Sequence, residues 1–404
     1  MVTNWPVLEK MKPFIQDAWT KAGFKEATPI QEKTIPYILE GQDVIAESPT
    51  GTGKTLAYLL PILDKIDVEK KEIQAVILAS SHELVMQLFG EFQKWSEGSD
   101  IYGASFIGGA NVKRQLEKIK KKPQIVFGTP GRVLELIKQK KFKMHEVKTL
   151  VLDEGDQLLV PEHLQTMKDI IKSTLKDRQI ILFSATLTEQ AESIVKEMVS
   201  EHAKTIRVER TEVNTGSQVD HIYFVAESRD KIEVIAKLSR VEGIRGLVFV
   251  RDIGNLSVLS EKLKFKRVPV EVLHSDANKT DRQTALSNFR SGKSNLLLAT
   301  DVAARGLDIQ GITHVVHYDL PKDVTEYTHR SGRTGRLGSS SGTVVSIVSG
   351  REVRELKQLA RKVNVEVEEK DFFKGQIVEK RSEVAKRSVN KPKKFKTNTK
   401  KTRG

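Results

Sequence analysis

The chain has 404 residues, of which 38% are hydrophobic and 30% are charged, and its formal net charge is +14. This length and composition predict a folded protein of two domains. The absence of cysteine excludes disulfides and thiolate metal sites and suits a reducing cytosol, so we expect a cytoplasmic protein. The nine histidines lack metal-ligand spacing, and apolar runs such as 57–63 are too short to cross a membrane.

The first motif with a chemical role is the glycine-rich stretch from Ser48 to Thr55. It follows a strand-like run at 43–46 and precedes a helical pattern at 56–60. Such a turn lets backbone N–H groups surround a polyphosphate at a helix N-terminus. Lys54 would neutralise the outer phosphates, and the Thr55 hydroxyl would bind Mg²⁺. Ser48 stands where the general pattern has glycine; an ordinary surface turn is the alternative, which the flanking strand and helix disfavour.

A second motif lies about a hundred residues further on, where an apolar run at 149–152 ends in acids. Acids that follow a buried parallel strand lie at its carboxyl end, the edge of the sheet that carries the phosphate loop. Asp153 is placed to hold Mg²⁺ through water, and Glu154 to orient or deprotonate the attacking water. An acidic loop that caps a helix is the alternative.

Strand-like runs alternate with amphipathic stretches in two halves of the chain. In the first half the runs are 44–46, 75–78, 124–127, 150–152 and 179–183. The hydrophobic pattern lapses at 209–217, which we interpret as a linker. It resumes at 247–250, 270–273, 296–299, 315–318 and 344–348. The fold class expected from this alternation is α/β, with two doubly wound parallel sheets.

The second half lacks a phosphate loop and has instead a basic cluster from His329 to Arg336. Two glycine-spaced arginines, Arg333 and Arg336, can reach a phosphate from the opposite side of a cleft. An arginine finger supplied in this way accelerates phosphoryl transfer by ~10³–10⁵. The alternative is a patch that binds RNA phosphates, and the same residues can serve both purposes.

The end of the chain is strongly basic. Residues 380–404 contain eleven Lys or Arg and one acid, so they carry ten of the fourteen net positive charges. A segment of this composition cannot bury a core, and we expect it to be disordered. Tails of this kind bind nucleic acid by neutralising phosphates and releasing counterions. A merely solubilising tail is the alternative.

Taken in order, these motifs resemble those of the DEAD-box RNA helicases from about Trp5 to about Val348. Gly23-Phe24 and Thr28-Pro29-Ile30-Gln31 resemble the family's adenine-sensing element, with Trp5 in place of its isolated upstream aromatic. The resemblance implies two tandem RecA-like domains, ATP and Mg²⁺ as ligands, and RNA as partner. The expected organisation is an ATP-binding domain at 1–208 with its adenine-sensing segment at 3–31, a linker at 209–217, a C-terminal helicase domain at 218–370 and a disordered basic tail at 371–404.

The resemblance also assigns roles to individual residues. Lys54, Asp153, Glu154, Arg333 and Arg336 would be catalytic, and Thr55 and Asp153 would hold Mg²⁺, partly through water. The residues implied for ATP binding are Phe24, Thr28, Gln31, Ser48, Pro49, Thr50, Gly51, Thr52, Gly53, Lys54, Thr55 and Asp308. Those implied for coupling hydrolysis to strand separation are Asp156, Ser184, Thr186 and His329. Those implied for RNA contact are Gly109, Thr129, Arg132, Thr300 and Gly306.

The sequence departs from the family pattern at a few positions. Gly155 stands in place of the alanine of the motif that names the family, and a glycine costs about 1 kcal/mol where a helix must continue. His82 replaces an arginine, which predicts one weaker phosphate contact or ion pair in the first half; we interpret His82 as a solvated side chain rather than a pH sensor. Ala27 replaces a common proline, and Lys279 a glutamine. These departures bear on RNA affinity more than on ATP hydrolysis.

The function we expect is that of a monomeric ATP-dependent RNA helicase, an RNA-dependent ATPase that acts on short duplexes with little sequence preference. An ATP-gated RNA-binding clamp or assembly scaffold ranks second, because Glu154 and Ser184-Ala185-Thr186 are intact. A DNA helicase of the same superfamily ranks third, because the Gln31 element counts against it. The compact form with a basic tail is typical of bacterial members that act on ribosomal precursors.

Overall fold

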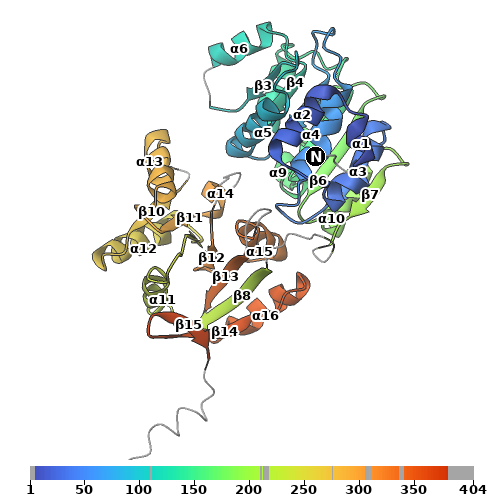
Figure 1. Ribbon diagram of the computed structural model, residues 1–404. Coiled ribbons are helices and arrows are strands. Elements are labelled where there is room, and N and C mark those ends of the chain that lie inside the picture. Colours follow the sequence, from blue (N-terminus) through green and yellow to red (C-terminus); the bar gives the residue numbers. More distant parts are fainter. Residues whose placement is uncertain are drawn as a thin grey trace, which may run out of the picture.

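The computed structural model describes residues 5–109, 112–209, 212, 218–274, 276–304, 309, 311–335 and 341–380. These residues form two α/β units, each built around its own sheet (Figure 1). The first sheet ends at Arg207 and the second begins at Gln218, on either side of the predicted linker. Of that linker, residues 210–211 and 213–217 lie outside the described residues.

The first unit has a seven-stranded sheet in the order β3-β4-β2-β5-β6-β1-β7, and all its pairs are parallel. Its strands are β1 (Val44–Glu47), β2 (Ala75–Leu78), β3 (Gly103–Phe106), β4 (Ile125–Gly128), β5 (Thr149–Asp153), β6 (Gln179–Ser184) and β7 (Lys204–Arg207). Its helices are α1 (Pro6–Glu9), α2 (Pro13–Ala22), α3 (Pro29–Leu39), α4 (Lys54–Lys65), α5 (His82–Trp95), α6 (Val112–Lys120), α7 (Pro130–Lys138), α8 (Gly155–Leu158), α9 (Pro161–Lys172) and α10 (Glu189–Lys196).

Both faces of this sheet are buried. Along β2, Ala75 and Ile77 belong to one apolar cluster, whereas Val76 and Leu78 belong to a second cluster on the opposite face. Because successive strand residues point to opposite faces, this alternation shows that helices cover the sheet on both sides. The carboxyl ends of the parallel strands are therefore the edge at which polar groups can gather.

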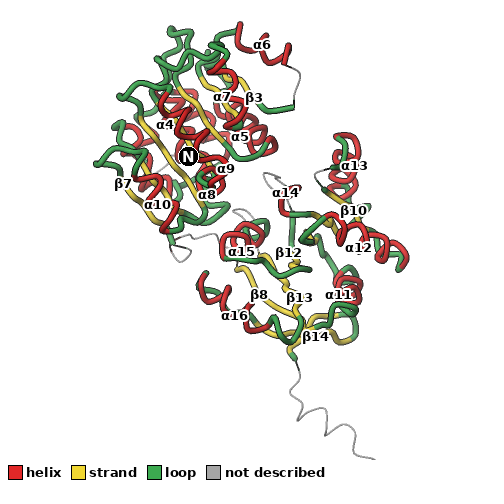
Figure 2. Tube along the Cα trace, turned by 180° about the vertical axis from the view of Figure 1, so that it is seen from behind, coloured by secondary structure: helices red, strands yellow, loops and turns green. Residues whose placement is uncertain are grey.

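The second unit has an eight-stranded sheet in the order β10-β11-β9-β12-β13-β8-β14-β15. Its strands are β8 (Gln218–Val225), β9 (Gly246–Phe249), β10 (Val270–Leu273), β11 (Leu296–Ala299), β12 (His314–His317), β13 (Ser341–Val348), β14 (Glu368–Phe373) and β15 (Gln376–Glu379). Its helices are α11 (Lys231–Leu238), α12 (Ile253–Phe265), α13 (Lys279–Arg290), α14 (Asp301–Ala304), α15 (Val324–Ser331) and α16 (Val353–Lys362) (Figure 2).

The predicted fold class, two doubly wound α/β domains, is confirmed, although the last pair of strands, β14 and β15, is antiparallel. No helix in the part of the chain that the structure describes is both long and apolar enough to span a bilayer.

The start of the tail differs from the expectation of a disordered segment from residue 371 onward. Residues 371–379 complete the hairpin of β14 and β15, which turns at Lys374 and Gly375 with φ of 50° and 81°. A two-residue turn with both φ positive matches the twist of antiparallel strands. Phe372 anchors the hairpin by stacking on Phe224, with ring centroids 4.5 Å apart. Residues 381–404 lie outside the described residues.

Candidate functional site

The phosphate loop joins β1 to α4, as the sequence predicts. Gly51 and Gly53 have φ of 77° and 89°, conformations that side chains other than glycine rarely adopt. Gly53 is the N-cap of α4, so the free backbone N–H groups of the first helical turn face the loop. The partial positive charge of a helix N-terminus favours a bound phosphate at this position.

Side chains brace the loop from within. The hydroxyls of Ser48 and Thr52 are buried and lie 2.7 Å apart, so the serine that replaces the general glycine contributes a hydrogen bond. The Lys54 ammonium donates to the carbonyls of Ser48 at 2.5 Å and Pro49 at 3.1 Å. Burial lowers the pKa of Lys54, while Asp153 acts in the opposite direction. The ammonium therefore lies inside the loop, next to a carboxylate of the second motif.

The two adjacent acids have different surroundings. Asp153 ends β5, is 5% exposed and accepts hydrogen bonds from Tyr58 Oη at 3.0 Å and from the Glu154 N–H at 3.0 Å. Burial and the neighbouring Glu154 raise its pKa to about 6. Glu154 has a φ of 52° and accepts a hydrogen bond from Ser80 Oγ at 3.2 Å. The two carboxylates thus differ in their hydrogen-bond partners, with Tyr58 on Asp153 and Ser80 on Glu154.

The donors near the loop fit Mg²⁺, which prefers oxygen ligands and retains several waters. Tyr58, one turn after Thr55 on α4, contacts Asp153 and links the two predicted metal ligands. Burial and Asp153 together raise the pKa of the Tyr58 phenol well above its usual value, so it acts as a hydrogen-bond donor. Sequence reasoning missed Tyr58; its only signal was a hydroxyl in an otherwise apolar stretch of helix.

The glycine of the acidic motif is accommodated by packing. Gly155 is buried at the start of α8, and a Cβ there would lie 2.6 Å from Cγ of Leu182 in β6. Leu182 thus fills the space that an alanine methyl would need. The departure from the family pattern is therefore matched by the position of a neighbouring side chain.

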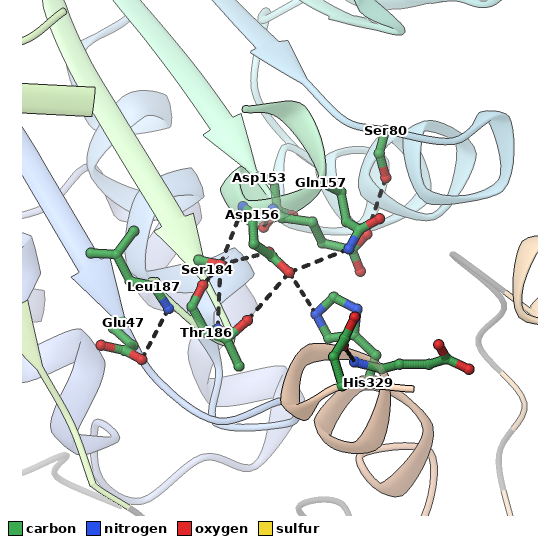
Figure 3. A network of polar contacts seen from close by, with 12 residues as sticks. Glu47, Ser80, Asp153, Asp156, Gln157, Ser184, Thr186, Leu187 and His329 are labelled. Carbon is green, nitrogen blue, oxygen red and sulfur yellow. Dashed lines mark hydrogen bonds and ion pairs between the residues drawn. The ribbon is translucent and has the colours of Figure 1, made fainter. Parts of the chain in front are cut away.

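Asp156 connects the two domains. It accepts hydrogen bonds from Ser184 Oγ at 2.6 Å and from Thr186 Oγ1 at 3.4 Å, and it lies 2.9 Å from His329 Nε2 of α15 (Figure 3). Burial alone would raise the pKa of Asp156, but the contacts with His329 and Ser184 bring it below its usual value. All four residues predicted for coupling, Asp156, Ser184, Thr186 and His329, therefore belong to one network.

The turn after α15 packs against the phosphate loop. A Cβ on Gly332 would lie 1.7 Å from Oγ1 of Thr50, so only glycine allows this approach between the domains. The next residue, Arg333, lines a cavity of about 460 Å³ together with Asp156, Thr300 and His329. A second bridge joins Glu83 of α5 to Arg282 of α13 at 2.9 Å. The domains thus meet around the predicted site.

The predicted adenine-sensing residues lie beside the phosphate loop. Thr28 is the N-cap of α3. The Gln31 side-chain amide accepts a hydrogen bond from the Thr28 backbone N–H at 3.0 Å and donates one to the Gly53 carbonyl at 3.1 Å. Gln31 is thus tied directly to the loop. Trp5 is buried against Trp19 in the core, whereas Phe24 is 42% exposed and stacks on Trp95 at 6.0 Å. Of these rings, Phe24 is the accessible one.

The residues predicted to contact RNA differ in how exposed they are. Gly109 is exposed with a φ of 69°, and Thr129 is the N-cap of α7. Arg132 is buried and donates to Gln115 at 3.2 Å and Glu135 at 2.6 Å, which ties α7 to α6. Thr300 is buried at the end of β11. Gly306, Asp308 and Arg336 lie outside the described residues.

Comparisons with known proteins agree with this geometry. Residues 28–194 match the family described as DEAD/DEAH box helicase, and residues 230–338 match the helicase conserved C-terminal domain. The chain is 55% identical to the probable ATP-dependent RNA helicase YfmL of Bacillus subtilis, over 82% of this chain and 88% of that protein. It is 49% identical to the DEAD-box ATP-dependent RNA helicase CshC of Bacillus cereus, over 94% of this chain and 97% of that protein.

A solved structure extends the likeness to both domains at once. The structure resembles S. cerevisiae Dbp5 bound to RNA and ADP BeF3, with a TM-score of 0.81 and 29% identity over 91% of this chain and 95% of that one. Since the matches cover both sheets and the motifs occur in order along them, the resemblance drawn from the sequence is confirmed. The chain belongs to the DEAD-box family of ATP-dependent RNA helicases.

Proposed function

We propose that this protein couples ATP hydrolysis between its two domains to the separation of short RNA duplexes or the remodelling of RNA–protein complexes. The observation that carries the proposal is the contact of α15 and its following turn with the first domain. His329 lies beside Asp156, and Gly332 lies against the phosphate loop at Thr50. Arg333 follows directly, so closure of the domains brings an arginine to the phosphate site.

Each group near the loop has a distinct task in this proposal. The loop amides and Lys54 bind the β- and γ-phosphates, and Glu154, held by Ser80, orients or deprotonates the attacking water. Arg333, with Arg336 by family pattern, stabilises the charge that develops on the transferred phosphoryl group. Mg²⁺ held by Thr55 and Asp153 would neutralise phosphate oxygens. Gln31 and Phe24 select and position adenine, and Asp308 contacts the ribose.

The coupling to RNA is proposed to run through Asp156. Ser184 and Thr186, at the end of β6 and just after it, contact the same carboxylate as His329 of the second domain. Loss of the γ-phosphate weakens closure, and this network transmits the change. RNA is gripped by its backbone through Gly109, Thr129, Thr300 and Gly306, while buried Arg132 positions α6 and α7. Bending of the gripped strand expels its complement.

The test uses two substitutions with opposite expected outcomes. Lys54→Ala should abolish ATP turnover, because the phosphates lose their counterion. Glu154→Gln keeps the hydrogen bond from Ser80 and should retain ATP and RNA in a long-lived complex without turnover. Steady-state ATPase and RNA dissociation rates measure both. Normal hydrolysis by Glu154→Gln would contradict the assignment of the base, and ATP-dependent RNA retention by the wild type without strand separation would favour a clamp.

The cellular setting is proposed from composition and family habit. We propose a cytoplasmic monomer that acts on structured RNA such as ribosomal precursors, because a strongly basic segment follows the two helicase domains. Crosslinking the protein to cellular RNA and sequencing the bound fragments tests the substrate. Fragments drawn mainly from messenger RNA, with none from ribosomal precursors, would contradict it.

A further inference from the structure

Phe265, the last residue of α12, is exposed to an unusual degree. Its exposed fraction is 91%, the largest among the big apolar side chains in the described parts of the chain. Val258 lies seven residues earlier on the same helix and is 49% exposed. Single exposed apolar residues are common on protein surfaces, so the surroundings of Phe265 decide what its exposure means.

Those surroundings are cationic. Residues 261–267 and 290–293 contain six Lys or Arg and one acid, Glu261. The two segments lie together, because Ser294 Oγ donates to the Pro269 carbonyl at 3.2 Å and the strands that follow them, β10 and β11, are neighbours. The cations are exposed at Lys262, Lys264, Lys266, Arg267, Arg290 and Lys293. Lys266 also pairs with Glu233 at 2.5 Å.

The backbone holds one of these cations at a position that favours glycine. Arg267 has a φ of 59°, and it ends α12 through hydrogen bonds from its own N–H to Lys264 at 2.9 Å and from Val268 to Leu263 at 3.0 Å. Helices that end in this motif usually place glycine there, because a side chain is strained in the left-handed region. The chain therefore retains an arginine where glycine would be more stable.

The patch lies far from the site between the domains. The residues before α12, Phe249 and Arg251, line the cavity that contains His329. The thirteen residues of α12 then run toward the opposite edge of the sheet, about 20 Å away at 1.5 Å per residue. In the ribbon view and in the tube view from behind, α12 lies at the outer margin of the second domain, away from α15 (Figures 1 and 2).

We propose that residues 262–267, with Arg290 and Lys293, form a second RNA-binding surface, here called the α12 patch. Phe265 stacks on an unpaired base, and the surrounding cations neutralise the flanking phosphates. An exposed ring within a cationic surface is the arrangement by which proteins hold single-stranded nucleic acid. The proposal rests on RNA as the substrate of the cleft, and it adds an anchor for RNA that extends beyond the cleft.

The experiment compares two RNAs by anisotropy across a salt series. One is a short strand that fills only the cleft, and the other carries an extension of about ten nucleotides at either end, enough to cover 20 Å at 3.4 Å per nucleotide. Phe265→Ala should weaken binding of the extended RNA about tenfold, since one stacked base contributes this much. Binding of the short RNA and its stimulation of ATPase should be unchanged. Absence of that stimulation in the wild type would instead refute the proposed function.

Matched variants separate the patch from general effects. Arg267→Gly should raise the thermal stability of the protein and weaken its binding of the extended RNA. Lys140→Gly replaces a left-handed lysine after α7, with φ of 56°, and should raise the stability without changing the affinity for the extended RNA. Leu175→Ala removes an accessible apolar side chain, 50% exposed, from the first domain and should have no effect. Equal losses in Lys140→Gly and Arg267→Gly would overturn the proposal. Unchanged binding of the extended RNA by Phe265→Ala would also overturn it. If that variant in addition lost a self-association seen for the wild type in sedimentation, the patch would be assigned to a second copy of the chain.

Discussion

Two adjacent carboxylates, Asp153 and Glu154, show how position at a strand end sets the surroundings of a side chain. Asp153 still belongs to β5 and is buried, whereas Glu154 has left the strand with a φ of 52°. A left-handed conformation at a residue other than glycine costs of order 1 kcal/mol and persists only where the surroundings hold it. Here the Ser80 hydroxyl and the start of α8 hold it.

The buried carboxylate predicts a pH-dependent loss of stability. The pKa of Asp153 is about 6 in the folded chain against an ordinary value of 3.8, so between these values the folded state retains a proton that the unfolded chain has lost. Unfolding free energy therefore falls as pH rises through this window. Asp153→Asn removes this titration and can still accept from Glu154 and donate to Tyr58. Without Mg²⁺ and nucleotide, Asp153→Asn should be more stable than the wild type at pH 8 by up to about 3 kcal/mol.

Denaturant unfolding at pH 4 and at pH 8 measures this difference. At pH 4 the two proteins should be nearly equal in stability, because Asp153 is then protonated in the folded wild type. The substitution should also abolish ATP turnover, which separates a stabilised protein from an active one. A constant difference between the two proteins across the pH range would contradict the raised pKa.

Among the elements, α5 and α13 carry a bridge between the domains that is separate from the α15 contacts. Glu83 pairs with Arg282 at 2.9 Å, and their side chains are 35% and 18% exposed. Arg282 also donates to the Ala303 carbonyl at 2.9 Å, so the arginine is held in place from its own domain. His82, next to Glu83, lies against Gly108, where an added Cβ would be 3.5 Å from the histidine Nε2. The bridge therefore lies beside the loop that is predicted to contact RNA.

The Glu83–Arg282 pair should favour the closed arrangement by a modest amount. A partly exposed ion pair contributes about 0.2–1 kcal/mol, so Glu83→Gln should raise the RNA concentration for half-maximal ATPase about twofold to fivefold. Arg282→Gln should act in the same direction. The double variant should resemble either single variant, and the coupling should shrink as salt rises. Additive effects of the two substitutions would show that the residues act independently.

Sequence periodicity predicted the central strands of the sheets well and the strands at the sheet edges poorly. The run at 75–78 is a four-residue apolar stretch, and β2 has the same bounds. The Gly-Ala-Ser-Phe of β3 was not predicted as a strand, because its β propensity is low and only its place at the sheet edge makes it one. The part of the β14–β15 hairpin from residue 371 onward was assigned to the tail, although Lys374-Gly375 between alternating residues is a turn signal.

The site was predictable where one segment carries the chemistry and unpredictable where two distant segments meet. The loop at 48–55 and the acids at 153–154 lie where β1 and β5 end, as their local sequence indicates. The contacts of Tyr58 with Asp153 and of Gly332 with Thr50 depend on packing between elements about 95 and 280 residues apart, which no local pattern encodes. Arg132 shows the same limit, because no local pattern indicates that its side chain is buried against Gln115 and Glu135.

At the scale of the whole molecule, positive charge is concentrated after the last strand. Lys380 pairs with Glu369, and Lys370 pairs with Glu368 and Glu379, so the three glutamates of the hairpin are engaged by adjacent lysines. Residues 381–404 then contain ten Lys or Arg and one acid. The two folded domains contain the proposed ATP site, and the basic segment follows them in the chain. Nucleotide chemistry and long-range attraction of RNA are thus expected to reside in different parts of the chain.

Removing the residues after Lys380 should weaken RNA binding and leave RNA-free ATPase activity unchanged. Each phosphate neutralised on a single strand contributes a slope of about −0.7 in log affinity against log salt. The ten cations cannot all engage at once, because mutual repulsion and chain entropy oppose it, so the slope should change by only a few units. Replacing 381–404 with a Gly/Ser segment of equal length controls for chain length, and it should behave like the truncation. RNA affinity across a salt series decides the matter: identical slopes for the full and shortened chains would leave the segment without a role on that RNA.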